Sequence, residues 1–476
     1  MSRRAKQTRG AQRPSRFFIT SLGCPKNSVD SQAMAVLLQR AGYRSTDDVT
    51  RADLVVVNTC GFIGAARAES LETLRELAAG LREEQRLVAA GCWAQREPEG
   101  LLERVPRIDA VIGTRSWEHI VTLAAELRAD PIASALALIE ECPFPLPEEA
   151  GVPGYAVVGA SAFLKVSDGC SRSCAFCAIP AIKGPGRSRS VDAILADTRL
   201  LQDMGVLEIN LIAQDVTAYG HDLGMRDGLP SLLEAMVQLA PNIPWFRLLY
   251  AFPGFITQRL IDVMAEHPQI LPYVDIPLQH GHPAVLQRMR RPTDVDWVRR
   301  TVEKLRRALP DVALRTTFIV GFPGETEEEF QALLDFAQEI HFDRVGVFTY
   351  SHEEGTAAAG MADDVPEAVK QARREALMLM QQDLSLERNR AFVGRRLPVL
   401  LEGAGDGLTV GRSYRDAPEI DGMVLIPGEI AAGQMIEVEI TDALVYDLMA
   451  RVVESPDAAE SGAAGQGVPT ASPSSL

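Results

Sequence analysis

Short apolar, β-branched runs alternate with helix-like stretches from Arg16 to about Leu127. Strands are predicted in four places, at Phe17 to Thr20, Leu54 to Val57, Leu87 to Ala90 and Ala110 to Ile112. Strands that alternate with helices in this way form a parallel sheet with helices on both faces. The pattern therefore predicts a small doubly wound α/β domain in this part of the chain.

The same alternation returns from Ala162 to about Tyr350, with amphipathic stretches such as Val191 to Met204 between the apolar runs. Six strands are predicted there, at Ala162 to Val166, Leu207 to Ile212, Trp245 to Tyr250, Tyr273 to Ile276, Leu314 to Val320 and Arg344 to Tyr350. Six β/α units are fewer than a closed barrel of eight needs, so we expect an incomplete (β/α)6 barrel.

The remaining sequence changes pattern twice. Pro366 to Asn389 is polar with little Gly or Pro, which predicts a long helix, and Arg396 to Val453 consists of short strands punctuated by Gly and Asp. The second segment predicts a small OB-like β-barrel of about sixty residues.

These patterns divide the chain into six parts. A Pro- and Glu-rich stretch from Cys142 to Pro153 breaks the periodicity and is typical of a linker. The predicted parts are a basic disordered arm (1–15), the α/β domain (16–141), a linker (142–154), the barrel domain (155–392), the small β-barrel (393–454) and a disordered tail (455–476).

Composition narrows the class of protein. No apolar run approaches membrane-spanning length, and the first sixteen residues are basic without the apolar stretch of a secretory signal, so we expect a cytoplasmic protein. The formal net charge is -16, whereas binding RNA through its phosphates normally needs a basic face. A basic partner is therefore favoured over a polyanion.

Three cysteines lie in one short loop with the spacing CxxxCxxC, at Cys170, Cys174 and Cys177, directly after a predicted strand. Three thiolates can hold three irons of a 4Fe-4S cluster, which leaves the fourth iron open for a substrate or cofactor. The alternatives are a zinc site or a chance group of buried cysteines, but structural zinc takes four ligands and no fourth one is nearby.

Cys24, Cys60 and Cys92 are far apart in the sequence, yet each directly follows a predicted strand of the α/β domain. Ligands bind beyond the carboxyl ends of such strands, so these three cysteines can converge on one point. The alternative is that they are small buried hydrophobes, as free cysteines often are. Cys142 belongs to neither set and is predicted to be inert.

The CxxxCxxC loop, with Phe176 before its last cysteine, resembles that of the radical S-adenosylmethionine (SAM) enzymes. The resemblance implies that the open iron chelates the amino and carboxylate groups of SAM, which is reductively cleaved to a 5'-deoxyadenosyl radical. The segment from Asn210 to Asp215 resembles the position that contacts the SAM amino group, which implies a cofactor contact for Gln214. An ordinary polar pair at a strand end is the alternative.

The segments SLGCPKN, VNTCGFI and AGCWAQ around Cys24, Cys60 and Cys92 resemble those of the methylthiotransferase family, and the resemblance covers about residues 16 to 453. It implies a second 4Fe-4S cluster, whose open iron carries the sulfur to be transferred. Both clusters are then expected to face one cavity, since proximity determines the yield of a radical reaction.

Members of this family modify either a tRNA adenosine or an aspartate of a small-subunit ribosomal protein. The C-terminal barrel resembles a TRAM module, which often binds RNA, but residues 395–454 hold five arginines, no lysine and eleven acidic residues, a net charge of about -6. Gly411 to Gly422 and Gly61 to Ile63 resemble the ribosomal-protein branch. Arg412 and Arg415 keep a contact with RNA open.

The resemblance therefore implies an aspartate methylthiotransferase. Such an enzyme inserts a methylthio group at the β-carbon of an aspartate of ribosomal protein uS12, on the free protein or the assembled subunit, using two 4Fe-4S clusters and two SAM per turnover. We expect a one-electron donor such as flavodoxin or ferredoxin, weak or absent direct binding to RNA, and no membrane partner.

Three alternatives remain open. The first is a tRNA adenosine methylthiotransferase, and the second is a non-catalytic, ribosome-associated Fe-S sensor. The third is a radical SAM methylase that adds carbon without sulfur, against which the three cysteines of the α/β domain argue.

Overall fold

The computed structural model describes residues 15–129, 136–139 and 144–453. It divides into two compact units, residues 1–385 and 386–476, which we describe separately. The predicted basic arm, except for its last residue, the segment with Cys142 and the predicted tail lie outside the described residues.

The first unit begins with a six-stranded parallel sheet in the order β2-β1-β3-β4-β5-β6. Its strands are β1 (Arg16–Ser21), β2 (Arg44–Ser45), β3 (Leu54–Thr59), β4 (Arg86–Ala90), β5 (Ala110–Gly113) and β6 (Leu136–Leu138). The chain adds β2 on one side of β1 and all later strands on the other, so the order reverses between β1 and β3. Ligands bind at such a reversal in doubly wound folds. The four strands expected from the sequence are confirmed.

Helices cover both faces of this sheet. They are α1 (Pro25–Arg40), α2 (Gly64–Gly80), α3 (Gly91–Arg96), α4 (Pro98–Arg104) and α5 (Ile120–Ala129), with the 3-10 turns η1 (Val49–Arg51) and η2 (Trp117–His119). Side chains alternate across β3, so Val56 joins a core with Met34 of α1 and Leu123 of α5. Val55 and Val57 join a second core on the opposite face, with α2 and α4. The predicted doubly wound domain is therefore confirmed.

A second sheet has the order β15-β14-β13-β12-β11-β8-β7 and remains open. Its strands are β7 (Tyr155–Val158), β8 (Ser161–Lys165), β11 (Glu208–Ile212), β12 (Trp245–Leu248), β13 (Ile270–Asp275), β14 (Ala313–Val320) and β15 (Arg344–Thr349). All but the antiparallel edge strand β7 are parallel and lie in chain order. The predicted set of six β/α units is confirmed.

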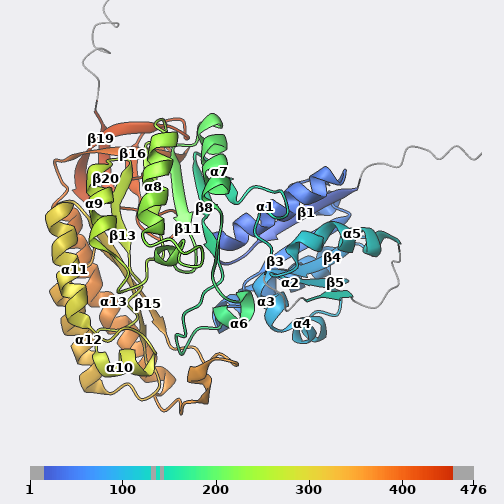
Figure 1. Ribbon diagram of the computed structural model, residues 1–476, viewed down its shortest axis with the longest axis horizontal. Helices are drawn as coiled ribbons and strands as arrows, with labels where there is room; N and C mark the ends of the chain where they lie inside the picture. The colour runs from blue at the N-terminus through green and yellow to red at the C-terminus, as the bar shows by residue number, and fades with distance from the viewer. Residues whose placement is uncertain (1–14, 130–135, 140–143, 454–476) are drawn as a thin grey trace, which may run out of the picture. The chain divides into compact units, whose positions relative to one another are not determined.

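A helix follows each of these six strands along the chain, and several of the helices are visible beside the sheet in Figure 1. They are α7 (Val191–Asp203), α8 (Gly228–Leu239), α9 (Gln258–Glu266), α11 (Val295–Ala308), α12 (Glu327–Ile340) and α13 (Glu367–Arg390). Shorter elements are β9 (Ser167–Asp168), β10 (Arg187–Ser188), α6 (Ile179–Lys183), α10 (Pro283–Arg288), η3 (Val216–Ala218) and η4 (Ala357–Gly360). Leu164, Leu211 and Leu248 pack in the helix-facing core. Alternate strand positions carry buried polar pairs, such as Glu208 with Arg247.

The second unit contains a closed five-stranded barrel in the order β16-β17-β18-β20-β19, which confirms the small β-barrel. The strands are β16 (Arg396–Gly405), β17 (Leu408–Arg412), β18 (Val424–Pro427), β19 (Met435–Ala443) and β20 (Leu448–Val452). Arg412 is buried and donates to Glu402. Arg415 is also buried, donates to Asn389 and lies over the ring of Phe392. These two arginines hold the unit together internally and do not present their charges to a phosphate backbone.

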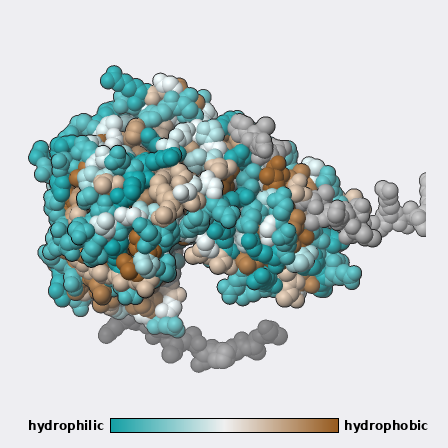
Figure 2. Space-filling view, turned by 90° about the horizontal axis from the view of Figure 1, so that it is seen from below, coloured by the Kyte–Doolittle hydropathy of each residue, from teal (hydrophilic) through white to brown (hydrophobic). Residues whose placement is uncertain are grey.

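No helix among the described residues combines the length and apolar character needed to cross a membrane. The face shown in Figure 2 is largely hydrophilic, and its hydrophobic residues are scattered.

Candidate active site

Cys24, Cys60 and Cys92 lie where three neighbouring strands end, on the two sides of the reversal in strand order. Cys24 precedes the first turn of α1, Cys60 directly follows β3, and Cys92 lies in the first turn of α3 after β4. Gly23 has a φ of +85°, and a Cβ on it would lie 2.6 Å from the Cβ of Cys60. Only glycine permits this backbone conformation and this approach of one cysteine segment to another.

Cys170, Cys174 and Cys177 occupy the loop between β9 and α6, and backbone hydrogen bonds fix its shape. The amide of Cys170 donates to the carbonyl of Gly184, and the amide of Ala175 donates to the carbonyl of Met289. Gly169 has a φ of +75°, and a Cβ on it would lie 2.3 Å from the carbonyl oxygen of Pro185. The loop is thus held against its own return segment and against the chain after α10.

All six cysteines line one cavity of about 320 Å³. Phe176 and Gln214, the two predicted cofactor contacts, line it as well. Its other lining residues are Lys26, Asn27, Phe62, Arg172, Ile179, Tyr250, Ala251, Phe252, Pro277, Gln279 and Arg291. The fold therefore brings together two cysteine triads that the sequence separates by more than 75 positions.

The spacing of the sulfurs suits a cluster better than a single ion. A tetrahedral zinc with sulfurs at about 2.3 Å would hold these atoms about 3.8 Å apart. Within the described part of the chain, neither triad brings its three sulfurs within 4.8 Å of one another. A 4Fe-4S cluster is larger and binds each cysteine to a different iron, so wider triads fit it.

Cys60 and Cys92 are buried, and the other four cysteines of the cavity are partly buried. Burial raises the pKa of Cys60 to about 11 and the pKa values of Cys92 and Cys177 to about 12. At neutral pH these thiols stay protonated until a metal displaces the proton. Neutral thiols can then pack in a low-dielectric cavity without mutual repulsion.

Two buried acceptors in the cavity wall fit an ammonium group. The side-chain nitrogen of Gln214 donates to Asp168 at 2.7 Å, which orients the amide, and the side-chain oxygens of Gln214 and Gln279 have no hydrogen-bond partner among the described residues. A buried polar atom without a partner is costly. The amino group of SAM would supply the missing donor, so the residues present fit this cofactor.

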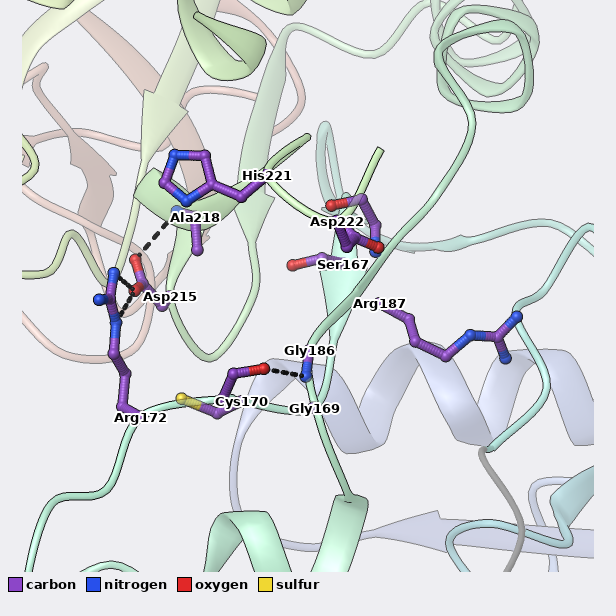
Figure 3. A pocket seen from close by; sticks show the side chains of 12 residues that line it. Ser167, Gly169, Cys170, Arg172, Gly186, Arg187, Asp215, Ala218, His221 and Asp222 are labelled. Atoms are coloured by element: carbon purple, nitrogen blue, oxygen red, sulfur yellow. Dashed lines mark hydrogen bonds and ion pairs between the residues drawn. The ribbon is translucent and has the colours of Figure 1, made fainter. Parts of the chain in front are cut away.

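Three cations line the cavity in different ways. Arg172 pairs with Asp215 beside Cys170, where a second cavity of about 150 Å³ adjoins the loop (Figure 3). Arg291 donates to the sulfur of Cys174 at 3.5 Å. The ammonium of Lys26 donates to the carbonyl of Ala213, and burial lowers the pKa of this lysine.

Buried ion pairs join the α/β domain to the second sheet at two places. At the first, Lys165 and Lys183 each donate to both Asp30 of α1 and Asp168. Burial alone would lower the pKa of Lys183, but the two carboxylates outweigh it and raise that pKa well above its usual value. We call this group the lysine clamp.

At the second place, the buried carboxylate of Glu353 binds three groups of the α/β domain. It accepts hydrogen bonds from Arg67, from Arg96 and from the backbone amide of Gly64, the first residue of α2. Burial alone would raise the pKa of Glu353, but the hydrogen bonds from Ser351, Arg67 and Arg96 lower it overall. We call this group the Glu353 clamp. The two clamps hold the two triads against one cavity.

Comparisons with known proteins agree with this geometry. Residues 164–337 match the radical SAM superfamily, residues 16–113 match the family UPF0004, and residues 393–453 match the TRAM domain. The chain is 48% identical to "Ribosomal protein uS12 methylthiotransferase RimO" of Roseiflexus sp. (strain RS-1), over 93% of this chain and 98% of the relative. The chain belongs to this RimO family. The relative of the same name from Chloroflexus aurantiacus is 47% identical, over 91% of this chain and 98% of the relative.

Solved structures support the fold alone. The methyltransferase TsrM from Kitasatospora setae, with cobalamin and a 4Fe-4S cluster, has a TM-score of 0.53 at 14% identity, over 84% of this chain and 81% of that chain. The radical SAM enzyme OxsB has a TM-score of 0.50 at 12% identity, over 78% of this chain and 56% of that chain.

Family membership confirms the family, the enzyme class and the three-part architecture expected from the motifs. Membership of the radical SAM superfamily also implies a 4Fe-4S cluster and SAM as cofactors. The sequence assigned no role to Lys26, Gln279 or either clamp. Lys26 and Gln279 had a usable signal, because each stands in a segment that resembles the family, SLGCPKN for Lys26 and Pro277 to His280 for Gln279.

Proposed function

We propose that this protein is a radical SAM methylthiotransferase that adds a methylthio group to the β-carbon of an aspartate in ribosomal protein uS12. The observation that carries the proposal is that two cysteine triads face one cavity of about 320 Å³. A radical SAM enzyme that transfers no sulfur would need only one of them. The 43–48% identity to the RimO relatives supports the choice of substrate.

Cys170, Cys174 and Cys177 would hold the SAM-binding cluster, and Cys24, Cys60 and Cys92 would hold the second, sulfur-carrying cluster. When bound, these cofactors supply the hydrogen-atom abstraction and the sulfur, because no side-chain acid or base removes a hydrogen from an unactivated carbon at neutral pH. Two SAM would be used per turnover.

The chain itself supplies binding, position and exclusion of water. The side-chain oxygens of Gln214 and Gln279 would accept hydrogen bonds from the SAM amino group. Phe62, Phe176 and Phe252 line the cavity with apolar surface, which would help to keep water from the reacting atoms once the cofactors and the substrate are bound. The clamps keep the triads at a fixed separation, since proximity and orientation determine whether a radical meets its target.

The β-barrel favours a basic protein loop over tRNA as the partner. Residues 395–454 carry a net charge of about -6, and two of their five arginines, Arg412 and Arg415, are buried. Phosphate binding needs exposed cations. We therefore infer that direct RNA binding is weak, that the substrate is uS12 alone or in the subunit, and that the site of action is the cytoplasm. A flavodoxin or ferredoxin would supply the electrons.

The boundaries expected from the sequence suit this function. We propose an α/β domain over residues 16–141, a radical SAM domain over 155–392 and a TRAM domain over 393–454. The matches at residues 16–113, 164–337 and 393–453 support these three boundaries.

The test is an anaerobic reaction. The protein is reconstituted with iron and sulfide, given SAM and a strong reductant, and offered uS12 and bulk tRNA in parallel, and both products are weighed by mass spectrometry. We expect a methylthio gain on uS12 that Cys60→Ala and Cys174→Ala remove. Cys142→Ala, outside both triads, is the matched control and should retain the gain. A gain on tRNA alone would contradict the proposal.

A further inference from the structure

Lys26 lies inside the cavity that both triads face. It stands in the first turn of α1, two residues after Cys24, and only 8% of its surface is exposed. Its ammonium donates to the backbone carbonyl of Ala213 at 3.3 Å and lies 3.5 Å from the ring centroid of Tyr250. The charge is therefore placed in the cavity rather than in bulk water.

The cations around Lys26 form direct ion pairs with carboxylates, whereas Lys26 interacts with Asp168 and Asp275 only at longer range. Lys165 and Lys183 are shared between Asp30 and Asp168, and Arg172 pairs with Asp215. Within the described residues, no carboxylate forms an ion pair with the ammonium of Lys26. A buried charge that lacks a counter-ion is costly, and a ligand carboxylate would remove that cost.

Arg291, the third cation of the cavity, faces a different group. It donates to the sulfur of Cys174 and to the carbonyl of Pro277, and it stacks on Phe252. A cysteine that binds a cluster is a thiolate, so Arg291 gains its anion when the cluster binds. Cys24 also becomes a thiolate and interacts with Lys26 through its charge. Among the described residues, however, the ammonium of Lys26 donates no hydrogen bond to that sulfur, and its donor partner is the carbonyl of Ala213.

Tyr250 holds Lys26 in place at a conformational cost. Tyr250 follows β12 with a φ of +66°, which is unfavourable for a residue with a side chain. Its backbone amide donates to the buried carboxylate of Asp275 at 3.1 Å, which fixes this conformation. Strained residues of this kind cluster at functional sites, and a ring face attracts an ammonium. The cavity is thus built to keep a cation at this point.

We propose that Lys26 is a specificity-determining residue that receives the side-chain carboxylate of the substrate. The inference rests on the proposed function, in which the substrate side chain is an aspartate. The β-carbon is bonded directly to the carboxylate carbon, so an anchored carboxylate places the reacting carbon between the two triads. An asparagine has the same shape without the charge, and Lys26 would discriminate against it.

The experiment compares two short uS12 peptides, with aspartate or asparagine at the target position. Binding to the reconstituted holoenzyme with SAM is measured by fluorescence anisotropy without reductant, and product formation is measured by mass spectrometry with reductant. Loss of a buried, charge-assisted contact weakens binding by about 100-fold. We expect the wild type to prefer the aspartate peptide by about that factor, Lys26→Met to lose the preference, and Lys26→Arg to keep most of it.

Several outcomes would overturn the assignment. Equal binding of both peptides by the wild type would overturn the assignment. This result needs no variant, so it stands even if Lys26→Met fails to fold. If Lys26→Met weakens the binding of both peptides by the same factor, Lys26 has only a structural role. If Lys26→Met weakens SAM binding in equilibrium dialysis and leaves the peptide preference unchanged, the carboxylate is that of SAM.

Failure of the proposed function has a different signature. In that case the wild type adds no methylthio group to either peptide under conditions in which it cleaves SAM. If the wild type forms product on the aspartate peptide and Lys26→Met keeps the same peptide preference, the proposed function stands and only the role of Lys26 is contradicted.

Discussion

The two cysteine triads face one cavity, but the chain assembles them differently. Cys170, Cys174 and Cys177 lie within eight consecutive residues of a single loop. Cys24, Cys60 and Cys92 come from three strand ends and depend on the parallel register that aligns Ser21 with Asn58 and Asn58 with Ala90. The loop triad is therefore a local structure, whereas the strand-end triad exists only when the sheet has formed.

The glycine before the first cysteine of each triad shows the same difference. A side chain on Gly169 would collide with the carbonyl of Pro185, sixteen residues further along the chain, whereas a side chain on Gly23 would collide with Cys60 of another strand end. Damage to one triad should therefore leave the other intact.

The largest expected effect is the loss of activity in cysteine variants, and it should differ between the two triads. Cys174→Ala should abolish both SAM cleavage and product, because the loop triad would bind SAM. Cys60→Ala should abolish product but leave SAM cleavage, and each variant should retain about four irons per chain. Chromatography of 5'-deoxyadenosine and an iron assay check both results. If Cys60→Ala also stopped SAM cleavage, the triads would not be independent.

A smaller effect is expected from the glycines. Gly23→Ala displaces Cys60, and a misplacement of about 1 Å can reduce a rate about 100-fold, so product should fall by about that factor while SAM cleavage persists. Gly186→Ala, where the new Cβ would meet nothing closer than 3.6 Å, is the control beside the loop triad and should change little. Equal losses of cleavage and product in Gly23→Ala would contradict the difference between the triads.

The Glu353 clamp tests whether the two triads must be held together. Glu353→Gln removes a buried charge that Arg67 and Arg96 share, which should cost about 3 kcal/mol of unfolding free energy. Product per SAM cleaved should also fall, since a looser α/β domain lets the radical escape. Thermal unfolding and the product to 5'-deoxyadenosine ratio measure the two effects. The exposed neighbour in Glu354→Gln is the control, and a similar loss in that variant would argue against the clamp.

The smallest effect is the pH dependence of this clamp. The pKa of Glu353 is lowered in the folded protein, so its contribution to stability is complete above the unfolded value of 4.5 and is lost as the pH falls through the lower, folded value. The difference in melting temperature between wild type and Glu353→Gln should therefore be constant near pH 7 and shrink below about pH 4.5. A difference that grows on acidification would reverse the assigned sign.

The sequence predicted the site best where chemistry and spacing are local. Cys170, Cys174 and Cys177 were predicted from their spacing. The positions of Cys24, Cys60 and Cys92 after strands predicted only that they can converge, and a cluster there was implied by the resemblance to the methylthiotransferase family. Strands β2 and β6 were missed because two or three residues give no periodicity, and β7 was missed because it is an antiparallel edge strand of four residues.

The clamps could not be predicted from the sequence. Asp30 and Lys165 are 135 positions apart, and Gly64 and Glu353 are 289 positions apart, and only the packing of one domain on the other joins them. The burial of Arg412 and Arg415 is similar, because an arginine in the barrel sequence has the same appearance whether it faces solvent or the interior.

The transfer of a single hydrogen atom tests whether both triads act on one aspartate in one cavity. uS12 is prepared with deuterium at the β-carbon of its aspartates and allowed to react anaerobically with the reconstituted protein, SAM and reductant. If both triads act on one aspartate in one cavity, 5'-deoxyadenosine gains deuterium in proportion to the methylthio group found on uS12. Deuterium-free 5'-deoxyadenosine, or a methylthio group on tRNA and none on uS12, would contradict the account.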